Sequence, residues 1–287
     1  MLALEAGILP SSGLVTLKLE SLQHSGSFKA RGAFNSLLSQ EIPAAGVIAA
    51  SGGNHGAAVA YAAKTLRHTA EIFVPTIAAA QKLARLEQYG ATTYQVGDNY
   101  AETLAACEAR QQQTGAMGIH AYDAATTIAG QGTIAREFEQ QTDGLDTMLV
   151  AVGGGGLISG VAGWFEDRAK VVAVETHGTA TLANAVKAGK PFETEVLGLA
   201  ADALGARVLG NYAFNMAAHH INDNLLVSDD DVRAAQRFLW RELRLVAEPA
   251  GATALAALLC GAYRPAPGER VGLIICGANT DPASVSS

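Results

Sequence analysis

The sequence is poor in cysteine and in charged residues, and each shortage excludes a class of protein. Its three cysteines, Cys107, Cys260 and Cys276, lie far apart and form no CxxC pair, which argues against disulfides and structural zinc and indicates a reducing compartment. Charged residues make up only 16% of the chain and hydrophobic residues 49%, so the composition excludes a disordered protein. The net charge of −7 is spread along the sequence, and we therefore expect no nucleic-acid partner.

Targeting and membrane segments are also lacking. Residues 1–7 contain no basic region followed by an apolar core, so the sequence shows no signal peptide and predicts a cytoplasmic protein. Residues 147–165 carry no charge and reach the length of a membrane span, but four consecutive glycines interrupt them. This stretch therefore predicts a strand, a turn and a helix, and we expect no membrane attachment.

Short apolar runs that alternate with alanine-rich helical stretches dominate the rest of the chain. The predicted strands and helices alternate as residues 47–50, 55–66, 71–74, 79–89, 92–96 and 100–114, and then 148–152, 157–165, 171–175, 179–188 and 271–276. Ser228, followed by three aspartates, reads as the cap of a further helix that ends near Leu243. The alternation predicts an α/β protein with parallel sheets covered on both faces. Because no linker divides the chain, a second domain would be inserted and not appended.

A single lysine, Lys29, stands in a loop of small residues, Ser25–Ala33, just after the strand-like stretch 15–19. Burial and nearby dipoles at such a position lower the pKa of an amine, which makes the amine a nucleophile able to form a Schiff base with an aldehyde cofactor. A solvated lysine at the start of a helix is the alternative interpretation.

The four glycines Gly153–Gly156 follow a buried strand and precede a helix, where backbone N–H groups can hold a phosphate. The same pattern occurs in nucleotide-binding sheets, and Glu175, about twenty residues further on, imitates the ribose-binding acid of a dinucleotide site. A nicotinamide-dependent oxidoreductase is therefore the rival hypothesis. The GxGxxG spacing fails, however, because its last position falls on Ile158 or Ser159.

Two further loops carry polar groups at strand ends. Residues 51–56, Ser-Gly-Gly-Asn-His-Gly, expose backbone amides suited to a carboxylate. An ordinary turn in which Ser51 or Asn54 caps the next helix is the alternative interpretation. Residues 274–280 end a buried strand with Cys276 and a glycine turn, and the thiol alone would read as a small buried hydrophobe.

Together and in this order, these segments resemble the fold-type II pyridoxal-phosphate enzymes, and within them the serine/threonine dehydratase family of the tryptophan synthase beta-like superfamily. The joint match is more specific than any one segment. It covers nearly the whole chain, because it includes three further stretches, Leu17–Glu20, Ile128–Ile134 and Glu248–Ala252. Ala30, which follows the lysine, points to the branch that contains dehydratases and racemases.

The resemblance implies a role for each segment. Lys29 would bind pyridoxal 5'-phosphate covalently and then remove the Cα proton of the substrate. Phe28 would lie beside the pyridine ring, Cys276 would face the ring nitrogen, and Asn54 would bond the ring hydroxyl. The resemblance assigns the cofactor phosphate to Gly153, Gly154, Gly155, Gly156 and Leu157, and the substrate carboxylate to Ser51, Gly52, Asn54 and His55.

The resemblance also implies architecture and reaction. A large cofactor-binding domain would comprise residues 1–45 and 124–287, with a small mobile domain, residues 46–123, inserted between them. The expected reaction is the dehydration and deamination of a β-hydroxy amino acid, threonine or serine first, to a 2-oxo acid and ammonia by a homodimer. Because the sequence stops soon after Asp281, we expect no C-terminal regulatory domain.

Several alternatives stay open. Racemases of this group carry a serine where this chain has Gly52, which makes racemisation the weaker hypothesis. Relatives with a divalent metal have an acid where this chain has Thr179 and Thr181, so we predict no metal. Hydroxyaspartate and phenylserine are further possible substrates, and a monovalent cation held by carbonyls is left open. A catalytically silent amino-acid-binding protein is disfavoured by the intact Lys29.

Overall fold

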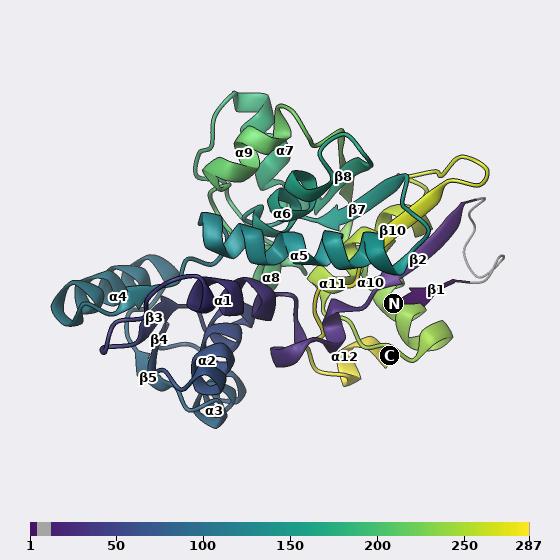
Figure 1. The fold of residues 1–287 in the computed structure, drawn as a ribbon. Coiled ribbons are helices and arrows are strands. Elements are labelled where there is room, and N and C mark those ends of the chain that lie inside the picture. The colour runs from purple at the N-terminus through teal and green to yellow at the C-terminus, as the bar shows by residue number, and fades with distance from the viewer. Residues whose placement is uncertain (5–12, 287) are drawn as a thin grey trace.

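The computed structural model describes residues 1–4 and 13–286, which form two sheets flanked by helices (Figure 1). This arrangement confirms the predicted α/β class with parallel sheets. Residues 5–12, part of the predicted large domain, lie outside the described residues. Within the described ranges, none of the helices combines the length and the apolar character needed to cross a membrane.

The larger sheet has six strands in the order β1-β2-β10-β7-β8-β9, and all neighbours are parallel except the pair β1 and β2. Its strands are β1 (Leu2–Ala3), β2 (Leu14–Lys18), β10 (Arg270–Ile274), β7 (Thr147–Ala151), β8 (Lys170–Thr176) and β9 (Asp223–Val227). Every residue of β7 is buried, as expected for a central strand of a parallel sheet covered on both faces. Strands β2 and β10, which come from opposite ends of the chain, lie side by side in this sheet.

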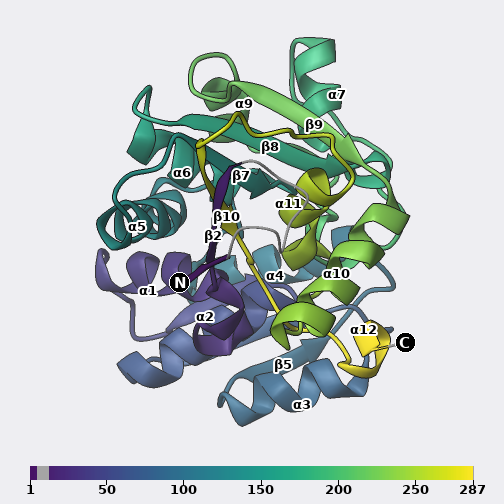
Figure 2. The same ribbon diagram turned by 90° about the vertical axis from the view of Figure 1, so that its right-hand side faces the viewer.

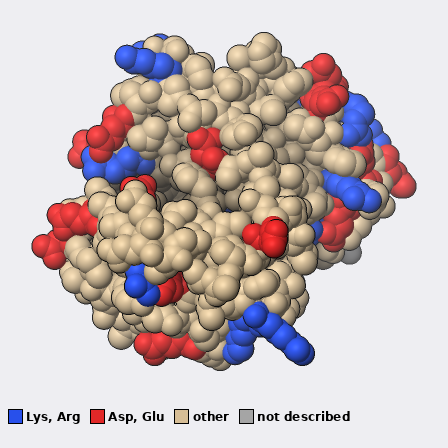
Figure 3. All heavy atoms as spheres, turned by 60° about the vertical axis from the view of Figure 1, so that its left-hand side comes forward, with Lys and Arg blue, Asp and Glu red and all other residues tan. Residues whose placement is uncertain are grey.

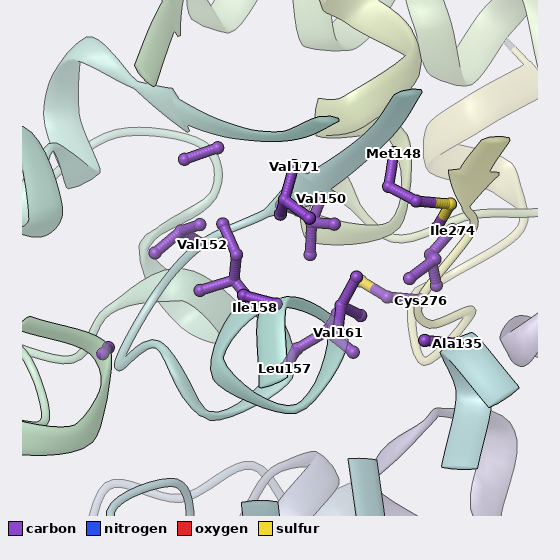
Figure 4. Close-up of a cluster of buried hydrophobic side chains, with 14 of the residues drawn as sticks. Ala135, Met148, Val150, Val152, Leu157, Ile158, Val161, Val171, Ile274 and Cys276 are labelled. Carbon is purple, nitrogen blue, oxygen red and sulfur yellow. The ribbon is translucent and has the colours of Figure 1, made fainter. Parts of the chain in front are cut away.

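Helices cover both faces of this sheet. On one face α5 (Ala125–Gln141), α6 (Gly156–Phe165) and α9 (Asn211–Ala217) enclose an apolar cluster that includes Ala135, Ile158 and Cys276 (Figure 4). On the other face α10 (Asp229–Leu243) and α11 (Pro249–Leu259) pack through Leu239 and Leu255. The shorter helices are α7 (Thr181–Ala188), α8 (Ala201–Leu204) and α12 (Ala283–Ser286).

The smaller sheet has four parallel strands in the order β5-β4-β3-β6, and it lies with α2 and α3 below the larger sheet in Figure 2. Its strands are β5 (Thr92–Gln95), β4 (Ala70–Val74), β3 (Val47–Ala50) and β6 (Met117–Gly118). Side chains of α2 (Asn54–Leu66) and α3 (Ala80–Gln88) form the core on one face, and α4 (Tyr100–Thr114) covers the other. The whole unit is inserted between α1 and α5 of the chain.

Helix α1 (Lys29–Leu38) lies between the two sheets, because it packs against both α2 and α5. Arg31 on its first turn bonds both carboxylate oxygens of the buried Glu20 at 2.7 Å and reaches Glu137 of α5 at 2.6 Å. Glu137 in turn pairs with Lys18 of β2 at 2.8 Å. This ion network fixes the first turn of α1 against the larger sheet.

The predicted elements agree with the observed ones to within two residues. The helix predicted from residue 179 begins at Thr181, because Thr179 closes a single 3₁₀ turn whose hydroxyl bonds Thr176 at 2.9 Å. Ser228 caps α10 as predicted and forms a reciprocal capping box with Asp231. On the face shown in Figure 3, acidic and basic side chains are interspersed among a largely uncharged surface.

Candidate active site

Lys29 is the first residue of α1, and the loop before it is held against the chain that follows β10. The Phe28 N–H donates to the Cys276 carbonyl at 3.0 Å, and the Ala278 N–H donates to the Gly26 carbonyl at 2.9 Å. Gly26 has a φ of 70°, and a Cβ there would lie 2.3 Å from the Asn279 side-chain oxygen, so the loop requires glycine. These contacts place Lys29 beside Cys276 and Asn279.

The Lys29 amine is largely shielded from water. Its Nζ donates to the Ala121 carbonyl at 2.7 Å and lies 5.2 Å from the centre of the Phe28 ring. Burial lowers the pKa of Lys29 from 10.5 to about 8, although the nearby Cys276 and Glu248 oppose the shift. An amine in this setting is neutral, and so nucleophilic, in a useful fraction of molecules near neutral pH. The exposed-lysine interpretation is therefore wrong.

The glycine turn lies where β7 passes into α6, which begins at Gly156. Gly155 has a φ of 90°, and a Cβ on it would meet the Ala213 side chain at 2.2 Å. A Cβ on Gly154 would lie 2.4 Å from the Tyr122 ring. The turn thus packs between Ala213 of α9 and the Tyr122 ring, which leave no room for side chains at Gly154 and Gly155. The N–H groups that begin α6 make it suited to an anion such as a phosphate.

The residues Ala121 and Tyr122 connect the lysine to this turn. Ala121 accepts the bond from Lys29, and the next residue packs its ring on Gly154. The Tyr122 hydroxyl donates to the Val208 carbonyl at 3.1 Å. The amine and the glycine turn therefore contact consecutive residues of one loop, which agrees with a cofactor that carries an aldehyde and a phosphate.

The next residue, Asp123, anchors this loop. Its carboxylate accepts bonds from the Asn211 side chain at 3.0 Å and from the Tyr212 N–H at 3.1 Å. These bonds hold the pKa of Asp123 below its usual value, against the effect of burial. Sequence reasoning gave Ala121, Tyr122 and Asp123 no individual role in the site.

The loop between β3 and α2 contributes Ser51–His55. Neither Ser51 nor Asn54 caps α2, because Gly53 holds the cap position without a side-chain bond, so the capped-turn interpretation is wrong. The His55 Nε2 lies 2.8 Å from the Ile119 carbonyl, and burial together with Lys29 lowers the pKa of His55 to about 3. His55 is therefore a neutral, positioned side chain and offers no positive charge to a carboxylate.

Asn54 is bonded at both ends of its side chain. Its Nδ2 donates to the Glu248 carboxylate at 2.6 Å, and its Oδ1 accepts from the Asn279 side chain. Asn279 also bonds the Ser25 carbonyl at 2.9 Å, next to the lysine loop. Glu248 and Asn279 lie within segments that carried the resemblance, but sequence reasoning gave them no role. They also line a cavity of about 410 Å³ whose other walls come from α8, α10 and the C-terminal segment.

Cys276 follows β10 and is buried, with its Sγ 3.4 Å from the Ala250 carbonyl. Burial raises the pKa of the Cys276 thiol well above its ordinary value. Figure 4 shows it among the apolar side chains of α6 and β10. The group at this position is therefore a neutral thiol that carries no formal charge.

Glu175, which raised the dinucleotide alternative, has its carboxylate fully engaged elsewhere. It accepts N–H bonds from Leu182 at 2.7 Å and Ala183 at 3.0 Å, and a side-chain bond from Asn224 at 3.0 Å. The side chain is buried and caps the start of α7. Because this carboxylate is buried and both of its oxygens bond other parts of the chain, Glu175 is not presented to a ribose, which removes the main support for the oxidoreductase hypothesis.

Comparisons with known proteins agree with this geometry. The profile described as "pyridoxal-phosphate dependent enzyme" matches residues 6–277. A phenylserine dehydratase from Ralstonia pickettii is 36% identical over 94% of this chain and 84% of its own length. A biosynthetic L-threonine dehydratase from Escherichia coli is 36% identical over 93% of this chain, which spans only 53% of that relative. The solved structure of maize serine racemase superposes with a TM-score of 0.89 at 31% identity, covering 95% of this chain and 85% of its own.

Proposed function

Because the chain belongs to the pyridoxal-phosphate dependent enzymes, we propose that it dehydrates and deaminates a β-hydroxy amino acid, with L-threonine and L-serine as the first candidates. The Cα–H and Cβ–O bonds break, water leaves, and hydrolysis of the resulting enamine gives a 2-oxo acid and ammonium. The observation that carries the proposal is the shielded Lys29 amine joined to the glycine turn through Ala121 and Tyr122.

The residues present fit pyridoxal 5'-phosphate. When bound, the cofactor supplies an electron sink that acidifies the Cα–H bond of an amino acid attached to it. Lys29 would hold it covalently, the N–H groups of Gly153–Leu157 would bind its phosphate, and Asn54 would bond its ring hydroxyl. Phe28 would lie against the ring. The neutral Cys276 thiol would face the ring nitrogen and could not compensate a positive charge there.

Lys29 would also act as the base that removes the Cα proton of the substrate. With a pKa of about 8, its free amine is basic enough to accept the Cα proton and is neutral often enough to do so near pH 8. Ser51, Gly52, Asn54 and His55 are proposed to receive the substrate carboxylate through the start of α2, whose N-terminal N–H groups favour an anion. Gly52 offers no hydroxyl as a second proton donor, which favours elimination over racemisation.

A spectroscopic and a product assay test this proposal together. The purified protein should show visible absorbance that borohydride abolishes, and peptide mass spectrometry should find the reduced cofactor on Lys29. Threonine, serine, phenylserine and 3-hydroxyaspartate should then be compared for release of a 2-oxo acid. Lys29→Ala should abolish both signals, whereas Lys64→Ala, on the exposed part of α2, should keep them. Turnover by Lys29→Ala would refute the assignment.

We also propose the finer organisation that the resemblance implies. Residues 1–45 and 124–287 would form the cofactor lobe, and residues 46–123 a smaller lobe that closes over the substrate in a cytoplasmic homodimer. The ion pair between Lys82 of α3 and Asp202 of α8, at 2.6 Å, joins the two proposed lobes. Sedimentation should give twice the mass of one chain, and X-ray scattering should show a smaller radius when substrate is bound.

A further inference from the structure

Glu248 occupies the cap position of α11 but does not act as a helix cap. It is 95% shielded from solvent, and its side chain makes no bond to the first turn of its own helix. A carboxylate at a helix start ordinarily bonds those N–H groups, since they lack partners within the helix. Here the carboxylate instead turns toward Asn54, whose Nδ2 donates to it at 2.6 Å. Its placement therefore serves the site and not the helix.

The bond from Glu248 settles which way the Asn54 amide faces. The amide oxygen already accepts from the Asn279 side chain, so the amide nitrogen must face the carboxylate. One Nδ2 hydrogen is used by Glu248, and one remains. That remaining N–H is the donor available to the ring hydroxyl of the cofactor. An ionised Glu248 accepts only, and it thereby holds Asn54 in this orientation.

The chain leaves space for the carboxylate at Gly277. A Cβ on Gly277 would lie 2.1 Å from the Glu248 Oε1, although the φ of this glycine is not positive. Glycine is thus required at position 277 to leave room for the Glu248 carboxylate, and not because of its backbone conformation. The Glu248 N–H also donates to the Gly277 carbonyl at 3.1 Å, and the Asn279 N–H donates to the carboxylate.

Four ionisable side chains influence the charge of Glu248. Lys29 on α1 and Arg85 on α3 favour its ionised form, whereas Asp202 on α8 and the Cys276 thiolate, if formed, oppose it. Glu248 forms no ion pair with a cation within the described residues. Burial dominates, and it raises the pKa of Glu248 from 4.5 to about 7. The carboxyl group therefore changes its charge within the range where enzymes operate.

We propose that Glu248 is a positioning residue, whose carboxylate holds Asn54 with an N–H directed at the ring hydroxyl of the cofactor. The inference rests on the proposed function, because the orientation of Asn54 matters for catalysis only when the cofactor is bound. Protonation of Glu248 removes the negative charge that strengthens its bond from the Asn54 nitrogen, so the Asn54 amide is held less tightly in this orientation. Cofactor affinity and turnover should consequently rise together as the pH increases through about 7.

The test compares the holoenzyme with its Glu248→Gln variant, a neutral mimic of the protonated side chain. In the wild type, the cofactor dissociation constant, measured from visible absorbance, should fall as the pH rises, with a midpoint near 7. In Glu248→Gln it should be raised about ten-fold at pH 8 and should not follow this titration, and kcat/KM should lose its acid limb. The Asn54 side-chain amide signals, identified by their loss in Asn54→Ala, should shift near pH 7 in the wild type alone.

A second variant and a control distinguish positioning from general damage. Gly277→Ala keeps Glu248 but places a methyl group where its carboxylate lies, so it should reproduce the raised dissociation constant. Glu175→Gln neutralises another buried carboxylate and should leave the pH profile unchanged. A wild-type acid limb in Glu248→Gln, or pH-independent Asn54 signals in the wild type, would overturn the inference alone. A wild-type protein that binds no cofactor would overturn both the inference and the proposed function.

Discussion

Replacing Lys29 by methionine should make the cofactor-free protein more stable at neutral pH while abolishing the reaction. Burial lowers the pKa of Lys29 from 10.5 to about 8, so the folded protein keeps this amine charged only at a cost. The difference corresponds to about 3 kcal/mol at neutral pH. Because Lys29 is partly exposed and its bond to Ala121 contributes about 1 kcal/mol, we expect a net gain of about 1–2 kcal/mol.

The stability difference between the wild type and Lys29→Met depends on pH in a defined direction. Below pH 8 both the folded and the unfolded wild type carry the proton on Lys29, and the full cost applies. Between pH 8 and 10.5 the folded protein loses the proton first, so the stability of the wild type rises relative to that of the variant. Above 10.5 neither state is charged and the advantage of methionine disappears.

Urea unfolding of the cofactor-free proteins between pH 6.5 and 10.5 measures this difference directly. Lys64→Met is the matched control, because Lys64 also donates to a backbone carbonyl, that of Gln88 at 2.8 Å, but at an exposed position. It should change the unfolding free energy by less than about 1 kcal/mol. A Lys29→Met protein that is less stable at pH 7, or whose advantage persists unchanged to pH 10.5, would refute the reasoning.

Three substitutions test other parts of the structure. Gly154→Ala should weaken cofactor binding at least about ten-fold, measured by absorbance titration, because its methyl group would meet the Tyr122 ring at 2.4 Å; unchanged binding would contradict the packing. Arg31→Met should lower the unfolding free energy by about 3–5 kcal/mol in urea, since it leaves Glu20 buried without a partner, and Glu20→Gln in the same chain should restore part of the loss. Gly56→Ala should raise the KM for substrate more than it lowers kcat, because a Cβ there lies 1.8 Å from a carbonyl of the substrate loop; a normal KM would count against that loop.

The fold was largely predictable because its signals are local. Residues 100–114 and 47–50 are bounded as predicted, since a helix and a buried strand each follow from the spacing of apolar side chains within one segment. The start of α7 was misplaced because Thr179 bonds back to Thr176, a side-chain interaction that hydrophobic periodicity does not report. The order of the strands in each sheet was not predicted, because it depends on contacts between segments far apart in the sequence.

The site was predictable only in part, for a related reason. Lys29 and the glycine turn were proposed from the sequence because each is marked by a characteristic run of consecutive residues. Glu248 was missed because its partner, Asn54, lies 194 residues away, and a glutamate before proline ordinarily reads as the start of a helix. Tyr122 was missed because its role is to pack a ring on Gly154, which no spacing rule predicts.

The loop that joins β6 to α5 is also one of the two connections by which the chain passes between its sheets. Ala121 and Tyr122 lie on this connection and contact the Lys29 amine and the glycine turn, respectively. A displacement of the smaller sheet would therefore move the residues that contact both groups. Exchange of modules between relatives is constrained as a result. A chimaera that takes its smaller sheet from another protein will have to cut the chain before residue 119, because a later boundary would replace the residues that contact Lys29 and the glycine turn.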